Sequence, residues 1–305
     1  MIPDSPSIKL ACCFENFPQK LTVFVKNEQV EKILENKISE FATKQNVEER
    51  AIKNYIKRKR YPISLLKHFP TNILKEIWNR EPVLFSKWKK VKVPTKLTPK
   101  LAYFVGYLQG DGSIESNKKR IDFSDEYKSQ IERMNELSKE LFLIGGKICE
   151  KRSALSKKPC YRLDIGSKVL NAYLHIVFSI NRGVKKDLQI PPVMKRNKVI
   201  LKWYLAGLYD ADGTLPKNPK TCKQAFVDIT MKDRAFIEDI NKQLARFHIK
   251  TLPIYCRKAK YPGSDKISTT WEIRIRRREM IQKFLRRVGF AHPNKRVRMQ
   301  ALLDP

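Results

Sequence analysis

Acidic residues are scarce in this sequence. It has 31 Asp and Glu against 63 Lys and Arg, which gives a formal charge of +32 and a pI of about 10.0. Metabolite enzymes need no such imbalance, and thermophile proteins rich in lysine usually raise glutamate in parallel. The basic residues are also spread over the whole chain. The composition therefore indicates a polyanionic partner, and nucleic acid in preference to a membrane surface.

Long apolar runs are also lacking, and the opening MIPDSPSIKL has no basic start followed by an apolar core. We therefore expect neither a membrane-spanning helix nor a signal peptide. The cysteines form no C-x-x-C pair and no Cys/His cluster, which excludes a zinc ribbon and a disulfide framework. These absences predict a cytoplasmic, nucleoid-associated protein with reduced thiols at Cys12, Cys13, Cys149, Cys160, Cys222 and Cys256.

One segment of the chain occurs twice. Residues 205–213 read LAGLYDADG, and residues 104–112 read FVGYLQGDG, with the same layout of apolar positions, glycines and a final Asp-Gly. Each copy predicts an apolar helix that delivers one carboxylate, Asp111 or Asp212. The glycine after each acid can adopt the left-handed turn that closes a helix. Two such helices side by side would bring the two acids together.

The two repeated helices are expected to pack closely through Gly106 and Gly207, where the helix face has no side chain. Thr98 is a natural N-cap followed by proline at the first helical position, so the first helix should start there and run to about Gln109. The second should begin near Asn197. It is apolar on nearly every side, as expected of a helix at the centre of a domain.

Two carboxylates at neighbouring helix ends are unfavourable without a counterion. Each faces the negative end of a helix macrodipole, at a cost of roughly 0.3 to 1 kcal/mol, and like charges repel further. A divalent cation is the simplest relief, because Mg²⁺ sites use one or two carboxylates plus water and substrate phosphate. We predict Mg²⁺, with Mn²⁺ also open, at Asp111 and Asp212 and the residues before them, Gly110 and Ala211.

Beyond each repeated helix the two halves continue in the same outline. An alternating stretch at 120–124 or 226–230 precedes an amphipathic helix at 129–143 or 233–247. A basic strand pair and a closing helix follow in both. Each half is therefore expected to contain a helix, two strands, a helix, two strands and a helix.

The first 80 or so residues have no counterpart in this repeat. Residues 31–66 suggest a helix-turn-helix, with Ala42 at the tight crossing, Asn46 at the left-handed turn and Ile52 on the inner face of the second helix. That second helix, at 48–60, is strongly basic. A plain helical hairpin with a solvated charged face accounts for the same pattern equally well.

The two motifs resemble those of the single-chain LAGLIDADG homing endonucleases, over about residues 97–300. The resemblance implies two pseudo-symmetric αββαββα halves that meet through the motif helices, each laying an antiparallel sheet along the DNA major groove. It also implies that Asp111 and Asp212 bind divalent metal at the scissile phosphates and that the two strands are cut with a stagger. The sixth motif position is often Asp, which Asp210 keeps and Gln109 does not.

Members of that family often carry a basic residue after the closing helix of each half, near the active centre. The matching segments hold Lys185 and Lys186 in the first half and Lys295 in the second. We select Lys186 and Lys295 as catalytic residues, although the choice between Lys185 and Lys186 stays open. Lysines that contact only phosphate or solvent would explain the same positions.

Sequence readout is expected from the strands at 161–167 and 271–277. The second of these alternates apolar with charged residues, so that one face packs and the other offers cations. Arginine contacts to base edges carry sequence information, whereas lysine contacts to phosphate make binding depend steeply on salt. The residues predicted to contact DNA are Arg120, Arg162, Arg274, Arg276, Lys151, Arg257 and Lys258.

These predictions divide the chain into four parts. They are a small helical, helix-turn-helix-like domain at 1–82, a basic linker at 83–96 and two LAGLIDADG halves at 97–190 and 191–305. The predicted fold class is α+β. The predicted function is a metal-dependent, site-specific endonuclease of the intron-homing type, active on double-stranded DNA as a monomer with internal pseudo-twofold symmetry. RNA is left open as a further partner, and no membrane partner is expected.

Two other functions are considered. Residues 210–215 match the D-x-D-G-T motif of haloacid dehalogenase phosphohydrolases, with Asp210 as nucleophile, but that motif should lie on an early strand with a full α/β domain after it. The stronger alternative is a sequence-specific binding protein on the same fold that does not cleave, either a regulator or an intron maturase. Such a protein has less reason to keep both acids, which favours the nuclease.

Overall fold

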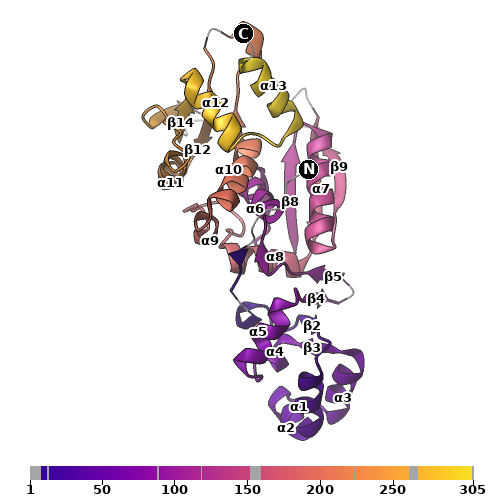
Figure 1. Cartoon of the computed structure of the whole chain (residues 1–305). Helices are drawn as coiled ribbons and strands as arrows, with labels where there is room; N and C mark the ends of the chain where they lie inside the picture. Colours follow the sequence, from indigo (N-terminus) through magenta and orange to yellow (C-terminus); the bar gives the residue numbers. More distant parts are fainter. Residues whose placement is uncertain are drawn as a thin grey trace.

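Two buried helices, α6 (Pro99–Asp111) and α10 (Lys198–Asp212), pack against each other at the centre of the molecule (Figure 1). The structure is a computed structural model that describes residues 8–11, 14–87, 89–117, 119–151, 159–222, 224–260 and 267–303. Every residue from 101 to 109 of α6 is buried. Helices that are apolar all round need cover on all sides, and the remaining elements provide it.

Side-chain caps set the start of both central helices. The Thr98 hydroxyl accepts a hydrogen bond from the Leu101 N–H at 3.3 Å. The Asn197 side-chain oxygen accepts from the Val199 and Ile200 N–H groups at 2.7 and 3.4 Å. Each cap satisfies backbone donors that have no partner inside the helix. The helices therefore start where the sequence indicates.

The glycines that follow the acids act differently from the sequence-based expectation. Gly112 has φ −100° and Gly213 has φ −70°, so neither adopts the left-handed conformation. A Cβ atom would instead lie 2.8 Å from the Leu108 carbonyl oxygen at Gly112 and 2.4 Å from that of Tyr209 at Gly213. Glycine is needed there because the chain leaves each helix by passing close to its last turn.

The first half wraps α6 in the predicted order. Its antiparallel sheet has the strand order β7-β8-β10-β9, and the helices α7 and α8 pack against it. Buried residues alternate along β8, with Ile121 and Phe123 on the helix-covered face. The elements are β7 (Gly112–Ile114), β8 (Arg120–Asp125), α7 (Lys128–Phe142), β9 (Lys147–Lys151), β10 (Cys160–Gly166) and α8 (Lys168–Phe178).

The second half repeats this order around α10. Its sheet has the strand order β11-β12-β14-β13, the same topology as in the first half, so the predicted pair of αββαββα halves is confirmed. The elements are β11 (Gly213–Thr214), β12 (Val227–Met231), α11 (Arg234–Ala245), β13 (Tyr255–Lys260), β14 (Ile267–Ile275) and α12 (Arg278–Arg287), with the short α9 (Pro192–Lys195) and η2 (Pro219–Thr221) and a further helix, α13 (Pro293–Leu303).

The N-terminal unit contains a sheet as well as the predicted helices, which the prediction of a small helical domain did not include. The predicted linker is corrected too, because residues 83–86 and 89–92 form β4 and β5, which extend the sheet β3-β2-β4-β5. Leu84 and Val91 are fully buried, which ties these strands to the core. The elements are η1 (Phe14–Asn16), β2 (Thr22–Phe24), α1 (Glu28–Asn36), α2 (Ile38–Gln45), α3 (Glu49–Arg58), β3 (Arg60–Pro62), α4 (Ile63–Leu66), α5 (Thr71–Asn79), β4 (Val83–Ser86) and β5 (Lys89–Lys92).

The helix pair α2 and α3 is joined by a tight turn. Asn46 has φ 51° and ψ 52°, the left-handed conformation that Asn tolerates better than most residues. Ala42 is buried, its carbonyl accepts from the Val47 N–H at 3.0 Å, and Ile52 has no exposed surface. Two short helices therefore meet at a tight left-handed turn at the predicted position.

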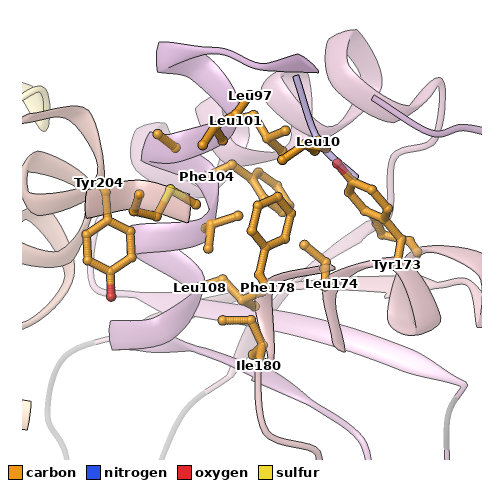
Figure 2. Packing of buried hydrophobic residues seen from close by; sticks show 14 of the residues in the cluster. Leu10, Leu97, Leu101, Phe104, Leu108, Tyr173, Leu174, Phe178, Ile180 and Tyr204 are labelled. Carbon is orange, nitrogen blue, oxygen red and sulfur yellow. The ribbon is translucent and has the colours of Figure 1, made fainter. Parts of the chain in front are cut away.

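The N-terminal unit is attached firmly to the first half. Strand β1 (Ile8–Lys9) pairs with β6 (Lys96–Leu97), and Figure 2 shows Leu10 in the cluster that also holds Leu97 and Tyr173. The Tyr173 hydroxyl donates to the Pro94 carbonyl at 2.8 Å. Buried residues of the N-terminal unit and of both halves therefore belong to one continuous core in the described part of the chain.

Two expectations about the chain's surroundings can be compared with the structure. Within the described ranges, no helix is long and apolar enough to cross a bilayer. Cys12 and Cys13 lie outside the described residues, whereas the described cysteines have free thiols: Cys149, Cys160, Cys222 and Cys256.

Candidate active site

Two glycines bring the backbones of the central helices into contact. A Cβ atom at Gly106 would lie 2.1 Å from the Tyr204 carbonyl oxygen, and one at Gly207 would lie 2.2 Å from that of Tyr103. Such distances leave no room for any side chain. Each glycine meets a tyrosine at the corresponding place in the other repeat, so the contact obeys the internal pseudo-twofold symmetry.

The two acids meet where these helices end. Asp111 is the last residue of α6, and Asp212 is the last residue of α10. A Cβ atom at Gly110 would lie 2.7 Å from Asp212 Oδ2, so the carboxylate of one repeat rests against the backbone of the other. Among the described residues, neither carboxylate has a hydrogen-bond or ion-pair partner.

The surroundings make both acids hold their protons more tightly than usual. Burial, followed by the charge of Asp212, raises the pKa of Asp111 to about 7, against the opposing charges of Lys295 and Lys185. Burial also raises the pKa of Asp212, which the same two lysines oppose. Two acids of this kind are stabilised in their charged form by a cation placed between them.

Lys295 closes the end of α10. Its Nζ donates to the carbonyl oxygens of Tyr209 at 3.1 Å, Asp210 at 2.5 Å, Ala211 at 3.0 Å and Gly213 at 2.8 Å. A cation at a helix C-terminus satisfies carbonyls without an intrahelical partner and complements the macrodipole. The same ammonium therefore counteracts the charge of the neighbouring acids.

Lys185 performs the same task at the end of α6, which corrects our choice of Lys186. The Lys185 Nζ donates to the carbonyl oxygens of Gln109, at 2.9 Å, and of Gly110. Both lysines are exposed at the surface, but only the Nζ of Lys185 reaches these carbonyls, whereas the backbone carbonyl of Lys186 accepts from Asn181 Nδ2. Burial lowers the pKa of both Lys185 and Lys295. The sequence context could not separate two adjacent lysines.

The donor set suits a hard divalent cation. The carbonyls of Gly110 and Ala211, which we predicted beside a metal, accept hydrogen bonds from the two lysines, so the carboxylates of Asp111 and Asp212 are the anionic donors. Within the described ranges, no three His, Cys, Asp or Glu residues gather into a metal cage. A pair of carboxylates suits a hard divalent cation that takes water and substrate phosphate as its other ligands, whereas a zinc site needs further protein ligands.

The sixth motif position anchors the chain that returns from the closing helix. In the second half, Asp210 Oδ2 accepts from the Tyr103 hydroxyl at 2.7 Å and from the N–H groups of Ala291 and His292 at 3.0 and 2.7 Å. Asp210 is only 1% exposed, and burial raises its pKa to about 6. A buried residue on a helix with these partners is no phosphohydrolase nucleophile, so that alternative is excluded.

Gln109 takes the equivalent place in the first half with reversed polarity. Its Oε1 accepts from the Tyr204 hydroxyl at 2.6 Å, and its Nε2 donates to the Gln189 carbonyl at 2.8 Å. In the first half the neighbouring backbone group is a carbonyl acceptor, whereas in the second half it is a pair of N–H donors. An amide can donate to the carbonyl, and a carboxylate cannot. The departure from the motif leaves the first half fully hydrogen-bonded at this point.

Sequence reasoning missed two residues next to this centre. Asp125, at the end of β8, accepts from the Tyr107 hydroxyl at 2.5 Å, and the His292 Nε2 lies 3.7 Å from its Oδ2. Burial raises the pKa of Asp125, but His292, Tyr107 and the Tyr127 N–H lower it by more. No local pattern could have paired residues so distant in the chain.

Comparison with known proteins agrees with this architecture. A LAGLIDADG-like domain matches residues 98–177 and 200–289, which is more than half of the chain, and each matched range contains one of the two acids. The chain belongs to the LAGLIDADG homing endonuclease family.

Several curated proteins are similar to this LAGLIDADG chain. The homing endonuclease I-ApeI of Aeropyrum pernix is 26% identical over 67% of this chain and 86% of its own length. A glutamine–fructose-6-phosphate aminotransferase of Methanocaldococcus jannaschii is 28% identical over 70% of this chain, and one component of the A-type ATP synthase of Pyrococcus abyssi is 45% identical over 21%. The chain spans only 18% of the aminotransferase and 6% of the ATP synthase component.

Solved structures of similar fold include two homing endonucleases. I-WcaI bound to its DNA recognition sequence is 16% identical, with a TM-score of 0.48, over 77% of this chain and 96% of that one. Variants of I-DmoI are 18% identical, with a TM-score of 0.45, over 66% and 97%. Full-length DUF199/WhiA from Thermatoga maritima is 14% identical, with a TM-score of 0.43, over 68% and 61%.

Ion pairs organise the open sheet face of the first LAGLIDADG half. Arg162 lies 2.9 Å from Asp122 and 2.8 Å from Asp164, and only 19% of its side chain is exposed. Arg120 pairs with Glu115 at 2.6 Å. The predicted DNA contacts on this face are thus held by acids, while Lys151, at the end of β9, is exposed.

The second half has a matching arrangement. Arg274 lies 2.7 Å from Asp228 and 2.9 Å from Glu272, and Arg257 lies 3.4 Å from Glu272. Arg276 is exposed just beyond the end of β14. Lys258 needs correction, because its register opposite Thr269, next to that of Arg257 opposite Thr270, puts it on the other sheet face.

Proposed function

We propose that this protein is a site-specific DNA endonuclease that hydrolyses phosphodiesters with a divalent metal held by Asp111 and Asp212. The observation that carries the proposal is the pair of acids without partners at the joined ends of α6 and α10. Burial and mutual repulsion disfavour their charged forms, so the pair of acids does not stabilise the fold. Binding of a cationic ligand would explain why both acids are present.

Asp111 and Asp212 would hold Mg²⁺ or Mn²⁺ together with water and the scissile phosphate. When bound, such an ion supplies positive charge that polarises the phosphate and activates water. Lys185 and Lys295 keep ammonium groups beside the acids through their bonds to the helix ends. There they would stabilise negative charge that develops on the phosphate during hydrolysis.

The internal symmetry supports one cut per strand. Each half contributes one acid and one lysine to the shared centre, namely Asp111 and Lys185 from the first and Asp212 and Lys295 from the second. Two scissile phosphates on opposite strands of one duplex are related by a twofold axis in the same way. We therefore propose a staggered double-strand cut by a monomer.

The open faces of the two sheets would contact the duplex. Acids hold Arg162 and Arg274 in place, which suits arginines that read base edges because less conformational freedom is lost on binding. Exposed Lys151, Arg257 and Arg276 would contact phosphate or bases at the periphery.

The N-terminal unit would add a second DNA contact through α3. Lys53, Lys57 and Arg58 are exposed on this helix, whose inner face is fixed by buried Ile52. Replacing these three cations with Gln should weaken DNA binding several-fold and reduce the salt dependence of affinity, with the metal-dependent chemistry unchanged. Equal affinity at all salt concentrations would leave α3 without a role in DNA binding.

A non-cleaving DNA- or RNA-binding protein on the same fold is the second candidate function. The observation that favours it is the tight turn between α2 and the basic helix α3 in the N-terminal unit. It predicts tight, sequence-specific binding that does not depend on Asp111 or Asp212. Retention of both acids favours the nuclease. The homing endonuclease I-ApeI, similar over most of its own length, supports the same choice.

The test uses duplexes enriched from a randomised DNA pool by binding to the protein, then incubated with Mg²⁺ or with EDTA. We expect cleavage of both strands with Mg²⁺ only, and a loss of at least about 100-fold in Asp111→Asn and Asp212→Asn with binding retained. Asp187→Asn, which changes an exposed carboxylate nearby, should cleave normally. Binding without cleavage by the native protein would favour the regulator or maturase.

A further inference from the structure

The segment that carries Lys295 is held by residues of the first half. Arg133, on α7, donates to the Ala291 carbonyl at 2.5 Å, and His292 Nε2 lies 3.7 Å from Asp125 Oδ2. His292 is 1% exposed, and its ring packs edge-on against Tyr127 with centroids 5.2 Å apart. Three residues of the first half therefore enclose the chain just before Lys295.

A hydrogen bond to Nδ1 sets the orientation of the His292 ring. Its Nδ1 accepts from the Asn294 backbone N–H at 3.2 Å, so in the neutral ring the proton is on Nε2, the atom that faces Asp125. The His292 backbone N–H donates to Asp210 at 2.7 Å. The residue thus connects the motif acid of its own half with a carboxylate of the other.

The segment that carries Lys185 is held by the second half in a corresponding way. Asp233 Oδ2 accepts from the Leu188 N–H at 2.7 Å, and its Oδ1 accepts from the Phe236 N–H at 3.1 Å, which caps α11. Asp233 precedes α11 as Tyr127 precedes α7. Both contacts therefore come from the same place in the repeat, although their chemistry differs.

We propose that His292 and Asp233 are positioning residues, each of which fixes the catalytic lysine of one half against the other half. The proposal rests on the proposed nuclease function. His292, seated on Asp125, would place Lys295, and Asp233, bonded to Leu188, would place Lys185. Each lysine is thereby set by the relative position of the two halves, so both centres assemble only when the halves are joined.

The two contacts act on different segments of the chain. The contact of His292 with Asp125 acts on the segment that carries Lys295, and the bond from the Leu188 N–H to Asp233 acts on the segment that carries Lys185. A change in one positioning residue should disturb one lysine and leave the other in place.

The first experiment measures each strand separately. The enriched duplex is labelled at one 5′ end or the other, and single-turnover cleavage with Mg²⁺ is followed for the native protein, His292→Ala and Asp233→Ser. Serine keeps the cap of α11 and removes the oxygen that Leu188 uses. We expect His292→Ala to slow one strand about 10-fold or more and Asp233→Ser to slow the opposite strand, so that nicked DNA accumulates.

A matched variant separates positioning from a general loss of structure. His292→Gln keeps an N–H donor near Asp125, so it should recover most of the rate lost in His292→Ala. Equal slowing of both strands by the two variants, or an unchanged ratio of the strand rates, would overturn the proposal.

The second experiment needs no cleavage and uses the full chain without DNA or metal. Hydrogen exchange is compared for the segments 289–297 and 183–190. His292→Ala should speed exchange in the first segment only, and Asp233→Ser in the second only. If exchange changes in this way but the native protein cleaves no DNA, the proposed nuclease function is refuted and the contacts between the halves are supported. Unchanged exchange in both segments would refute the contacts themselves.

Discussion

The two halves of the molecule share the same central contacts, namely the glycine contacts and the acid and lysine at each helix end, which we call the frame. They hold this frame in place with different side chains, which we call its supports. Gly106 and Gly207 make equivalent contacts, and each motif helix ends in an acid with a lysine bound to its last carbonyls. Behind this frame, the second half uses the carboxylate of Asp210 and the first uses the amide of Gln109. Direct contact between the two helix backbones allows only glycine, whereas the hydrogen-bonded position can be filled by a donor or by an acceptor if its partner group changes with it.

The difference shows which positions of the duplication are most tightly constrained. The residue type is the same in both halves where the residue must contact the opposite helix or would contact the reacting phosphate. The residue type differs where the side chain only anchors the chain that returns from the closing helix. Substitutions made at equivalent positions should therefore have equal effects in the frame and unequal effects in its supports.

The largest effect is expected at the glycine contact. Gly106→Ala and Gly207→Ala place a methyl group 2.1 and 2.2 Å from a backbone oxygen, so α6 and α10 must move apart. Each should destabilise the protein by about 3 kcal/mol or more, and by similar amounts. Chemical denaturation measures both. A large loss for one glycine and none for the other would break the symmetry of the frame.

Removing either lysine should have the next largest effect. Lys185→Ala and Lys295→Ala should each reduce cleavage about 100-fold, because each removes a positive charge beside the acids. Lys186→Ala is the matched control, and it should cleave within about 2-fold of the native rate. Strand-resolved cleavage assays measure all three. An effect of Lys186→Ala equal to that of Lys185→Ala would contradict the assignment.

Replacing the amide of Gln109 with a carboxylate should lower the free energy of unfolding. Gln109→Glu points a carboxylate at the Gln189 carbonyl, so the folded state loses about 2 kcal/mol near pH 8. The glutamic acid should have a raised pKa, because only its protonated form can donate to that carbonyl. The loss should therefore shrink as pH falls toward 5. Denaturation at the two pH values measures it, and an equal loss at both would refute the account of Gln109.

The titration of Asp111 predicts a smaller, pH-dependent effect. Its pKa of about 7 lies above the ordinary 3.8, so the folded protein without metal binds this proton more tightly than the unfolded chain. That contribution to stability is complete below about pH 4 and is lost as pH rises through about 7. Asn does not titrate, so Asp111→Asn should gain stability relative to the native protein as pH rises from 4 to 8. Thermal unfolding in EDTA measures this gain, and a constant difference would contradict it.

The frame could be predicted from the sequence because short segments of the sequence determine where its helices begin and end. Thr98 and Asn197 mark where the motif helices start, and the repeated Asp-Gly marks where they end. Alternating apolar residues predicted the strands of both halves, and Asn46 predicted the turn between α2 and α3. All of these follow from the periodicity or cap preferences of single segments.

The remaining features depend on contacts between distant segments. Whether Lys185 or Lys186 reaches α6 is decided by the path of one loop, and the contact of Asp125 with His292 by the packing of two halves. The segment that begins at residue 83 has the composition of a linker, yet residues 83–86 and 89–92 are strands, because Leu84 and Val91 are buried. Local composition carries too little information to predict such pairings.

The most direct test of the central claim is to locate the metal. A crystal of the protein with an enriched duplex and Mn²⁺ should show anomalous density within about 2.2 Å of carboxylate oxygens from both Asp111 and Asp212. Asp111→Asn with Asp212→Asn should abolish that density while the duplex stays bound. Density at another site, or none between the two acids with DNA in place, would contradict the account.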